Sequence, residues 1–246
     1  MRVEEGFVLT RGRAGTGIDG LDALIEGGFQ ERKAYLICGE PGTGKTTFCL
    51  QFLLKGLGQG EAGVYVTVDE KPSHLIEDAQ SMGWDLTSYL DRKELLILDA
   101  SPYFTNLRLG KEKELDVRQV VSDLSKHVKS LGARRLVIDP VAPLIFKDES
   151  QAVVMEYIRS LIFSIEDNLG CTALFTSHMV TGSDRLSRFG VEEFIVSGIV
   201  LLRIVRAQNR YIRTLFVRKM RGTAIDLTEY SFDIVRGRGI VLRQAV

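Results

Sequence analysis

The stretch GEPGTGKT, from Gly39 to Thr46, contains the residue types that can bind the phosphates of a nucleotide. Its spacing fits the pattern G-x-x-x-x-G-K-[ST], in which a loop joins a strand to a helix. The glycines let the backbone curl so that successive N–H groups face phosphate oxygens. Lys45 is long enough to reach the β- and γ-phosphates, and the Thr46 hydroxyl is placed to bind Mg²⁺. The pattern therefore predicts a nucleoside triphosphate site.

The context of this loop agrees with the pattern. An apolar stretch, AYLIC, comes before the loop, and a helical stretch, TTFCLQFLLKGL, follows it. The N-terminus of such a helix adds the positive end of its dipole to the phosphate site. The predicted phosphate-binding residues are Gly39, Glu40, Pro41, Gly42, Thr43, Gly44, Lys45, Thr46 and Thr47.

Acidic side chains follow two other apolar runs. Asp139 comes directly after Leu136–Ile138, a short Walker B pattern, and is the predicted partner of Thr46 in holding Mg²⁺. Asp69 and Glu70 follow the run VYVTV. Because ligands collect at the carboxyl ends of parallel strands, we expect all three carboxylates to face the phosphates.

In this arrangement Glu70 is the candidate general base, which orients or deprotonates the attacking water, and Asp69 assists it. A solvated loop at a strand end is the alternative interpretation of both acids, and a cap for the helix beginning near Pro72 is a further alternative for Asp69. His178 ends another apolar run in TSH, a position suited to sensing the γ-phosphate.

The elements that position these residues alternate along the chain. Helices are expected at 45–57, 72–82, about 115–131 and about 150–169, between apolar runs at 33–39, 62–69, 94–100, 134–140 and 171–178. The runs are continuously apolar, as in a parallel sheet covered by helices on both faces. After His178, two hairpin patterns follow, FIVSGIVLLRIV with RYIRTLFVRKM, and EYSFDIVRGRGIVL. We predict one α/β domain over 1–246, a mainly parallel twisted sheet with a C-terminal antiparallel extension.

Composition limits the class of protein. The chain has 246 residues, 26% charged and 45% apolar, with a net charge of zero, so no global field attracts DNA or an acidic membrane. Its three cysteines form no metal or disulfide pattern, and no run is long enough to span a membrane, so we expect a cytoplasmic protein without a membrane partner. The C-terminal part is nevertheless basic: acids Asp226, Glu229 and Asp233 stand against Arg203, Arg206, Arg210, Arg213, Arg218, Lys219, Arg221, Arg236, Arg238 and Arg243.

Several segments, in order, resemble the KaiC branch of the RecA superfamily from about residue 14 to 225. They are TGIDGLDALIEGGF, GEPGTGKTTFCLQFL, VYVTVDEKP, SMGWDL, RRLVIDP and FGVEEF. The resemblance implies a RecA-like P-loop NTPase fold, ATP with Mg²⁺, and a homo-oligomeric ring, usually a hexamer, with ATP between subunits. It also implies that Asp69 and Glu70 are the catalytic carboxylates.

The segment RKMRGTAID resembles the K-x-R-G-T segment of the family. The resemblance assigns Lys219 and Arg221 to the γ-phosphate bound by a neighbouring subunit, where a cation stabilises the transferred phosphoryl group. An edge strand with solubilising charges is the alternative. Met220, Thr223 and Ser81 are further candidates for lining the nucleotide pocket.

The chain also departs from circadian KaiC, which has two such domains. The stretch GVEEFIVSG resembles the first domain, which is not phosphorylated, so autokinase activity is not expected. Three functions stay open: an ATP-hydrolysing ring that drives a conformational or signalling cycle with a protein partner, a DNA-binding recombinase relative, and a nucleotide-gated scaffold without hydrolysis. For single-stranded DNA, the candidate loops are VAPLIFKDES and MVTGSDRLSRFG, the second with Arg185, Arg188 and Phe189.

Overall fold

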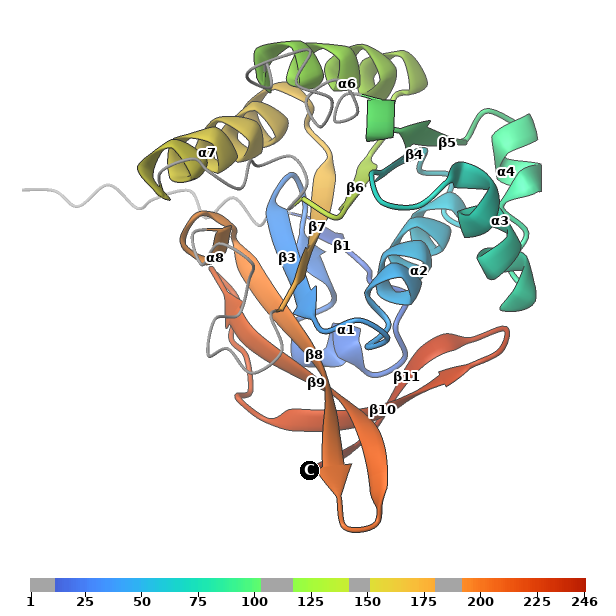
Figure 1. Ribbon diagram of the computed structural model, residues 1–246, viewed down its shortest axis with the longest axis vertical. Helices are drawn as coiled ribbons and strands as arrows, with labels where there is room; N and C mark the ends of the chain where they lie inside the picture. The colour runs from blue at the N-terminus through green and yellow to red at the C-terminus, as the bar shows by residue number, and fades with distance from the viewer. Residues whose placement is uncertain (1–11, 103–116, 142–150, 180–191) are drawn as a thin grey trace, which may run out of the picture.

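A computed structural model of the chain describes residues 12–102, 117–141, 151–179 and 192–246. Within these residues a nine-stranded sheet runs in the order β11-β10-β9-β8-β3-β7-β6-β4-β5 (Figure 1). Its strands are β3 (Ala34–Gly39), β4 (Gly63–Thr67), β5 (Leu95–Asp99), β6 (Arg135–Asp139), β7 (Thr172–His178), β8 (Gly198–Ala207), β9 (Arg210–Met220), β10 (Glu229–Val235) and β11 (Gly239–Ala245). The main helices are α2 (Lys45–Leu57), α3 (Pro72–Ser81), α6 (Val117–Leu131) and α7 (Gln151–Asn168).

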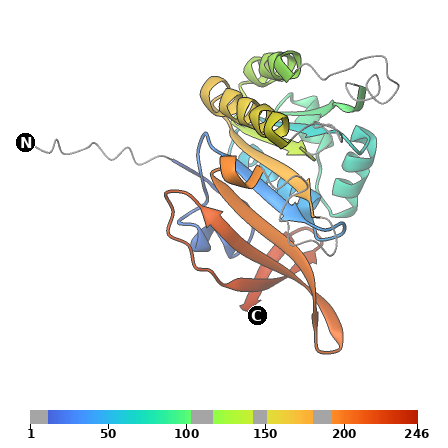
Figure 2. The same cartoon turned by 60° about the vertical axis from the view of Figure 1, so that its left-hand side comes forward.

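Strands β5, β4, β6, β7, β3 and β8 pair in parallel. Helices α6 and α7 lie on one side of the sheet, and α2 and α3 on the other (Figures 1 and 2). Residues such as Val128 and Ile162 join the core on the first side, and Phe48 and Leu75 join it on the second. The predicted parallel sheet with helices on both faces is therefore confirmed, and the two covered faces explain the continuously apolar strands.

The predicted C-terminal extension is also confirmed. Strand β8 is parallel to β3 but antiparallel to β9, and β9–β10 and β10–β11 continue the antiparallel pattern. The β8–β9 hairpin projects beyond the rest of the sheet, while β10 and β11 curve back beneath α2 (Figure 1). The Gln51 side chain ties α2 to β11, because its amide donates to Arg238 O at 2.9 Å and accepts from Ile240 N at 2.6 Å.

The short elements were not predicted, because none of them is long enough to repeat its pattern twice. They are β1 (Arg13–Ala14) and β2 (Phe29–Gln30), which pair with each other, and the helices α1 (Leu21–Leu24), α4 (Thr87–Asp91) and α8 (Glu192–Ile195). The three cysteines are buried and free, and burial raises the pKa of Cys171 to about 12. Among the described residues, no helix combines the length and apolar character needed to cross a membrane.

A buried arginine at the start of β6 fixes this strand against α2. The Arg135 side chain is 1% exposed, and its Nε donates to Glu61 Oε2 at 2.6 Å. Its Nη1 donates to the carbonyl oxygens of Gly15 and Phe52, each at 2.7 Å. A Cβ at Gly56 would lie 2.2 Å from Arg135 Nε, so only glycine leaves room for the guanidinium. Since β6 ends at Asp139 and α2 begins at Lys45, this contact helps to align the two halves of the phosphate site.

We expect Arg135→Met to lower the free energy of unfolding by about 3 kcal/mol, because it leaves the Glu61 carboxylate and two carbonyl groups without their buried partner. Urea unfolding would measure the change. Arg134→Met is the matched control: Arg134 is 58% exposed and pairs with Glu31 at 3.7 Å, so its loss should cost less than about 1 kcal/mol. Equal effects of the two substitutions would contradict the structural role of Arg135.

Candidate nucleotide-binding site

The phosphate loop lies between the end of β3 and the start of α2. Gly42 and Gly44 have φ angles of 79° and 104°, a region that favours glycine. A Cβ on Gly39 would lie 2.5 Å from both Leu202 O and Thr43 Oγ1, so the loop also needs glycine at its first position. Thr43 donates its hydroxyl to Glu40 O at 2.8 Å, which closes the turn. The backbone is thus shaped as the sequence pattern requires.

Lys45 lies within this loop. It is 6% exposed, and its Nζ donates to Gly39 O at 2.8 Å and to Glu40 O at 3.0 Å. Burial lowers the pKa of Lys45 from 10.5, while the negative charge of Asp139 acts in the opposite direction. The ammonium is therefore held where phosphate oxygens would approach the loop, and a bound phosphate would favour its charged form. Thr47 lies in the first turn of α2, beside Thr46.

Asp139, at the end of β6, accepts hydrogen bonds from residues of α2, β4 and β7 at this edge of the sheet. Thr46 donates its hydroxyl to Asp139 Oδ2 at 3.0 Å, which brings together the two predicted Mg²⁺ residues. The Tyr65 hydroxyl also donates to Oδ2, and the Thr176 hydroxyl donates to Oδ1. Burial, together with the charge of Asp139, raises the pKa of Tyr65 well above its usual value, so the phenol keeps its proton. Hydroxyl and carboxylate oxygens are ligands that suit Mg²⁺, so this donor set fits the metal.

Tyr65 and Thr176 were missed by the sequence analysis. Each lies in a strand next to β6: Tyr65 pairs with Val137, two residues before Asp139, and Thr176 follows Phe175, which pairs with Ile138. Their position beside Asp139 depends on strand order, which the amino-acid pattern does not contain. A polar residue in an otherwise apolar run was the available signal.

The acidic pair lies in the bend between β4 and α3. The Thr67 hydroxyl donates to Glu70 O at 2.6 Å, which fixes the bend. Asp69 is exposed, whereas Glu70 is half-buried. The pKa of Glu70 is raised from 4.5, first by burial and then by the negative charges of Asp78 and Asp139. Thr67 pairs with Asp139 and Val68 N donates to Asp139 O at 3.1 Å, so Glu70 follows β4 at the edge of the sheet where the Walker B carboxylate lies. Among the described residues, none forms an ion pair with Glu70.

His178 lies beside the start of the phosphate loop, because it pairs with Gly39 in the β3–β7 register. The next residue, Met179, donates its N–H to Gly39 O at 3.2 Å. Ser81 ends α3, and its hydroxyl donates to Asp78 O at 2.7 Å. The β10–β11 turn meets this end of α3, where Gly237 N donates to Met82 O at 2.7 Å.

Lys219 and Arg221 lie at the opposite edge of the sheet from the phosphate loop. Lys219 donates to Glu193 O at 2.9 Å and to Val196 O at 2.8 Å, and Arg221 donates to Phe194 O at 2.9 Å. Both side chains thus bind carbonyl groups at the C-terminal end of α8, which is a favourable place for cations. Burial lowers the pKa of Lys219, and the charge of Arg221 adds to this shift.

The strand register places this basic end away from the loop on the same chain. Gly198 pairs with Tyr35 and Met220, whereas Leu202 pairs with Gly39. From Gly198 to Leu202 the strand rises by about 13 Å. Lys219 and Arg221 therefore stand near the beginning of β3, and the phosphate loop stands at its end.

The other candidates from the tail also lie at this far edge. The Met220 side chain is 6% exposed and belongs to the core, and its Sδ would be 2.7 Å from a Cβ on Gly198. Its side chain is therefore not available to a nucleotide, which differs from the expectation that it lines the pocket. Thr223 Oγ1 accepts a hydrogen bond from Arg13 Nη1 at 2.8 Å. The candidate DNA loops, with Arg185, Arg188 and Phe189, lie outside the described residues except for the end residues Val141 and Met179.

The C-terminal extension also contacts the phosphate loop, which no pattern in the sequence indicated. Arg213, in β9, donates from Nε to Gly42 O at 3.2 Å. Ile234, in β10, packs close to Gly44, since its Cδ1 would lie 3.0 Å from a Cβ there. The extension therefore forms one wall beside the loop.

The family model described as ATPase: KaiC matches residues 14–245. The chain belongs to the KaiC-type ATPase family. This match confirms the family suggested by the ordered motifs, and it covers both the parallel core and the C-terminal extension. Membership supports binding of ATP by the phosphate loop.

Relatives of two lengths are similar to this KaiC-type chain. UPF0273 protein PH0284 from Pyrococcus horikoshii is 34% identical, with 94% of this chain and 93% of the relative covered. The circadian clock oscillator protein KaiC from Thermostichus vulcanus is 35% identical over 92% of this chain, which spans 43% of that protein. The crystal structure of KaiC-like protein PH0186 from Pyrococcus horikoshii superposes with a TM-score of 0.81 at 33% identity, covering 95% of this chain and all of the other. The superposition confirms the RecA-like fold class.

Proposed function

We propose that the protein is an Mg²⁺-dependent ATPase that works as a homo-oligomeric ring, usually a hexamer, with each ATP between two subunits. The main support is the division of the site between two edges of one sheet. Lys45, Thr46, Asp139 and Glu70 gather at the carboxyl edge, and Lys219 and Arg221 stand at the other. Copies that stack head-to-tail would bring the second edge of one subunit to the first edge of the next.

In this proposal each residue of the carboxyl edge has a separate role. The N–H groups of the loop and the Lys45 ammonium bind the β- and γ-phosphates. Thr46 and Asp139 are the residues that would hold Mg²⁺, which neutralises charge on the phosphates when it is bound. Glu70 accepts a proton from the attacking water. The water oxygen then bonds to the γ-phosphorus as the bond to the bridging oxygen breaks, which gives ADP and phosphate.

The opposite edge supplies positive charge from the neighbour. As the γ-phosphoryl group transfers, its equatorial oxygens carry charge that a guanidinium stabilises well. In the single chain, Arg221 is exposed and its guanidinium is bound only to Phe194 O among the described residues, so the other N–H groups of the guanidinium can bind phosphate oxygens. Hydrolysis would then depend on contact between subunits, which suits a conformational or signalling cycle that acts on a protein partner.

Specific ATPase activity should rise with protein concentration over the range in which the ring assembles, because an isolated chain lacks the neighbour's cations. Phosphate release and sedimentation, measured on the same samples, test this expectation. Equal specific activity for monomer and assembly would contradict the shared site. Absence of hydrolysis at every concentration, with ATP bound, would instead support the nucleotide-gated scaffold.

A further inference from the structure

The β8–β9 hairpin carries a concentration of positive charge that the proposed ATPase does not explain. From Gly198 to Met220 the chain has no acidic residue, although its net charge is zero. The basic residues of this segment are Arg203, Arg206, Arg210, Arg213, Arg218 and Lys219. Lys219 belongs to the proposed shared site. The five arginines leave most of the hairpin with positive charge only.

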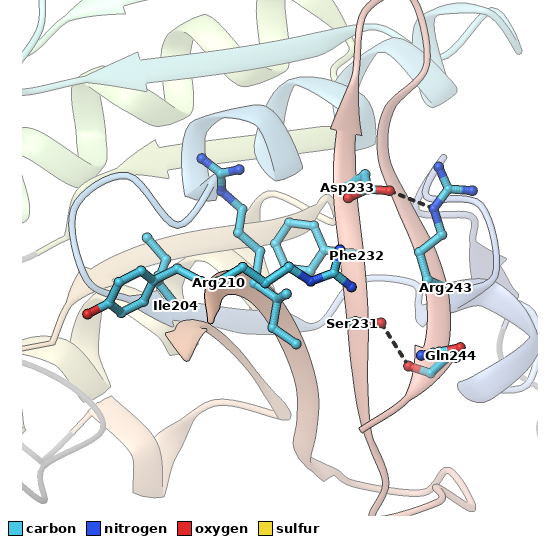
Figure 3. A pocket seen from close by; sticks show the side chains of 10 residues that line it. Ile204, Arg210, Ser231, Phe232, Asp233, Arg243 and Gln244 are labelled. Atoms are coloured by element: carbon cyan, nitrogen blue, oxygen red, sulfur yellow. Dashed lines mark hydrogen bonds and ion pairs between the residues drawn. The ribbon is translucent and has the colours of Figure 1, made fainter. Parts of the chain in front are cut away.

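A groove of about 580 Å³ lies where this hairpin meets β10 and β11 (Figure 3). Arg210 reaches from β9 toward Phe232 in β10, and Arg243 in β11 turns to Asp233, which it pairs with at 2.8 Å (Figure 3). Tyr211 also lines the groove and is 72% exposed, although it is a large aromatic side chain. The groove thus combines an exposed ring with guanidinium groups.

The charges in this groove are not balanced. Asp233 is the acidic residue of its lining, and it is paired with Arg243. Among the described residues, no carboxylate pairs with Arg210 or Arg213, and Arg213 uses Nε for the carbonyl oxygen of Gly42. Two guanidinium groups are therefore available to an anionic ligand beside the phosphate loop.

We propose that this groove binds a single-stranded polynucleotide, with Arg210 and Arg213 on its phosphates and Tyr211 stacked on a base. Proteins that bind single strands combine a positive groove, which follows the backbone, with aromatic side chains that stack on bases. None of the residues that line this groove belongs to the candidate loops VAPLIFKDES and MVTGSDRLSRFG.

Charge disfavours a second copy of the chain as the occupant. The hairpin of a second copy has no acidic residue from Gly198 to Met220 that could pair with these arginines, so like charges would meet. An apolar peptide would strip water from two unpaired guanidinium groups, which is costly. A polyanion with planar bases satisfies both the charges and the exposed ring.

Binding of fluorescent oligothymidylate and oligouridylate of about 20 nucleotides to the full chain, measured by anisotropy over a range of salt, tests this proposal. We expect Tyr211→Ala to weaken binding about tenfold at unchanged salt slope, since stacking is lost but no phosphate contact. Arg210→Ala should reduce the slope of log K against log salt by about 0.7. Arg218→Ala removes the same charge from β9 outside the groove and should change neither quantity by a comparable amount. The two oligonucleotides distinguish DNA from RNA as the source of the strand.

Three outcomes would overturn the proposal. The first is no binding of either oligonucleotide at low salt, including the case in which vesicles of anionic lipid bind instead. The second is equal loss in the Arg218→Ala control. The third is a smaller assembly in the groove variants with unchanged oligonucleotide affinity, which would make the groove an interface between copies. Because the measurement needs no hydrolysis, its failure and a failure of the ATPase proposal are distinguishable.

Discussion

Replacing Glu70 by glutamine will lower the rate of ATP hydrolysis by about 100- to 10,000-fold while ATP still binds. The amide keeps the size of the side chain but cannot accept a proton from the attacking water. ATP binding depends mainly on the phosphate loop, whose contacts with Lys45 and Thr46 do not involve the Glu70 carboxylate. Single-turnover hydrolysis measures the first effect, and equilibrium binding of a labelled nucleotide measures the second.

Glu77→Gln is a suitable control for this substitution, because Glu77 is exposed on the neighbouring α3 and undergoes the same chemical change. Asp69→Asn should have a smaller effect than Glu70→Gln, since Asp69 is the more exposed of the two carboxylates. Full turnover by Glu70→Gln would remove the general base from the mechanism. Loss of ATP binding in that variant would show that Glu70 acts on the loop rather than on water.

The acid side of the pH–rate profile gives a second test of the same residue. Glu70 acts as a base only when it is deprotonated, so activity should rise with pH through a pKa that lies above 4.5. His74 lowers the pKa of Glu70, so His74→Ala should raise that pKa and move the rise in activity to higher pH. A shift of the rise in activity to lower pH would contradict the assignment of this pKa to Glu70.

Arg221→Ala should lower turnover by about 1,000-fold or more, because a cation supplied from a neighbouring subunit stabilises the charge of the transferred phosphoryl group. The substitution also removes the hydrogen bond to Phe194 O, so the melting temperature and the size of the assembly must be measured with the rate. A large loss of rate with an intact assembly is the expected result.

Mixing two inactive variants separates this role from a local structural one. The two variants, Arg221→Ala and Glu70→Gln, are mixed in equal amounts and assemble at random. About one site in four then has Glu70 from an Arg221→Ala chain and Arg221 from a neighbouring Glu70→Gln chain. The mixture should therefore regain activity that neither variant has alone. Chains that carry both substitutions cannot complement themselves and are the control. No recovery in mixed assemblies would mean that Arg221 does not act across the interface.

The parts of the site that are local in sequence were predictable. The phosphate loop depends on glycines, a lysine and a threonine that are close together in the sequence. The apolar run before the loop predicted β3, and the helical pattern after it predicted α2. Asp139 was found in the same way, at the end of a run. The resemblance to the family then added Lys219 and Arg221, which composition alone would leave as charges on an edge strand.

The contacts that depend on strand order were not predictable. Tyr65 and Thr176 meet Asp139 because β4 and β7 flank β6, and Arg213 meets Gly42 because β8 lies beside β3. Each pair is far apart in sequence, so neither periodicity nor turn residues indicate it. The burial of Met220 is also a result of packing, since β9 turns this side chain toward Tyr35 and Gly198.

If the groove binds a polynucleotide as proposed, the hydrogen bond from Arg213 to Gly42 would link the binding of nucleotide and of polynucleotide thermodynamically. The Arg213 guanidinium is bound to the phosphate loop and would also contact a polynucleotide on the hairpin. Binding of either ligand would therefore affect the binding of the other. If nucleotide raises the affinity for the polynucleotide by some factor, the polynucleotide must raise the affinity for nucleotide by the same factor. A ligand bound to the β8–β9 hairpin would then change the affinity for nucleotide at the phosphate loop, next to the first turn of α2.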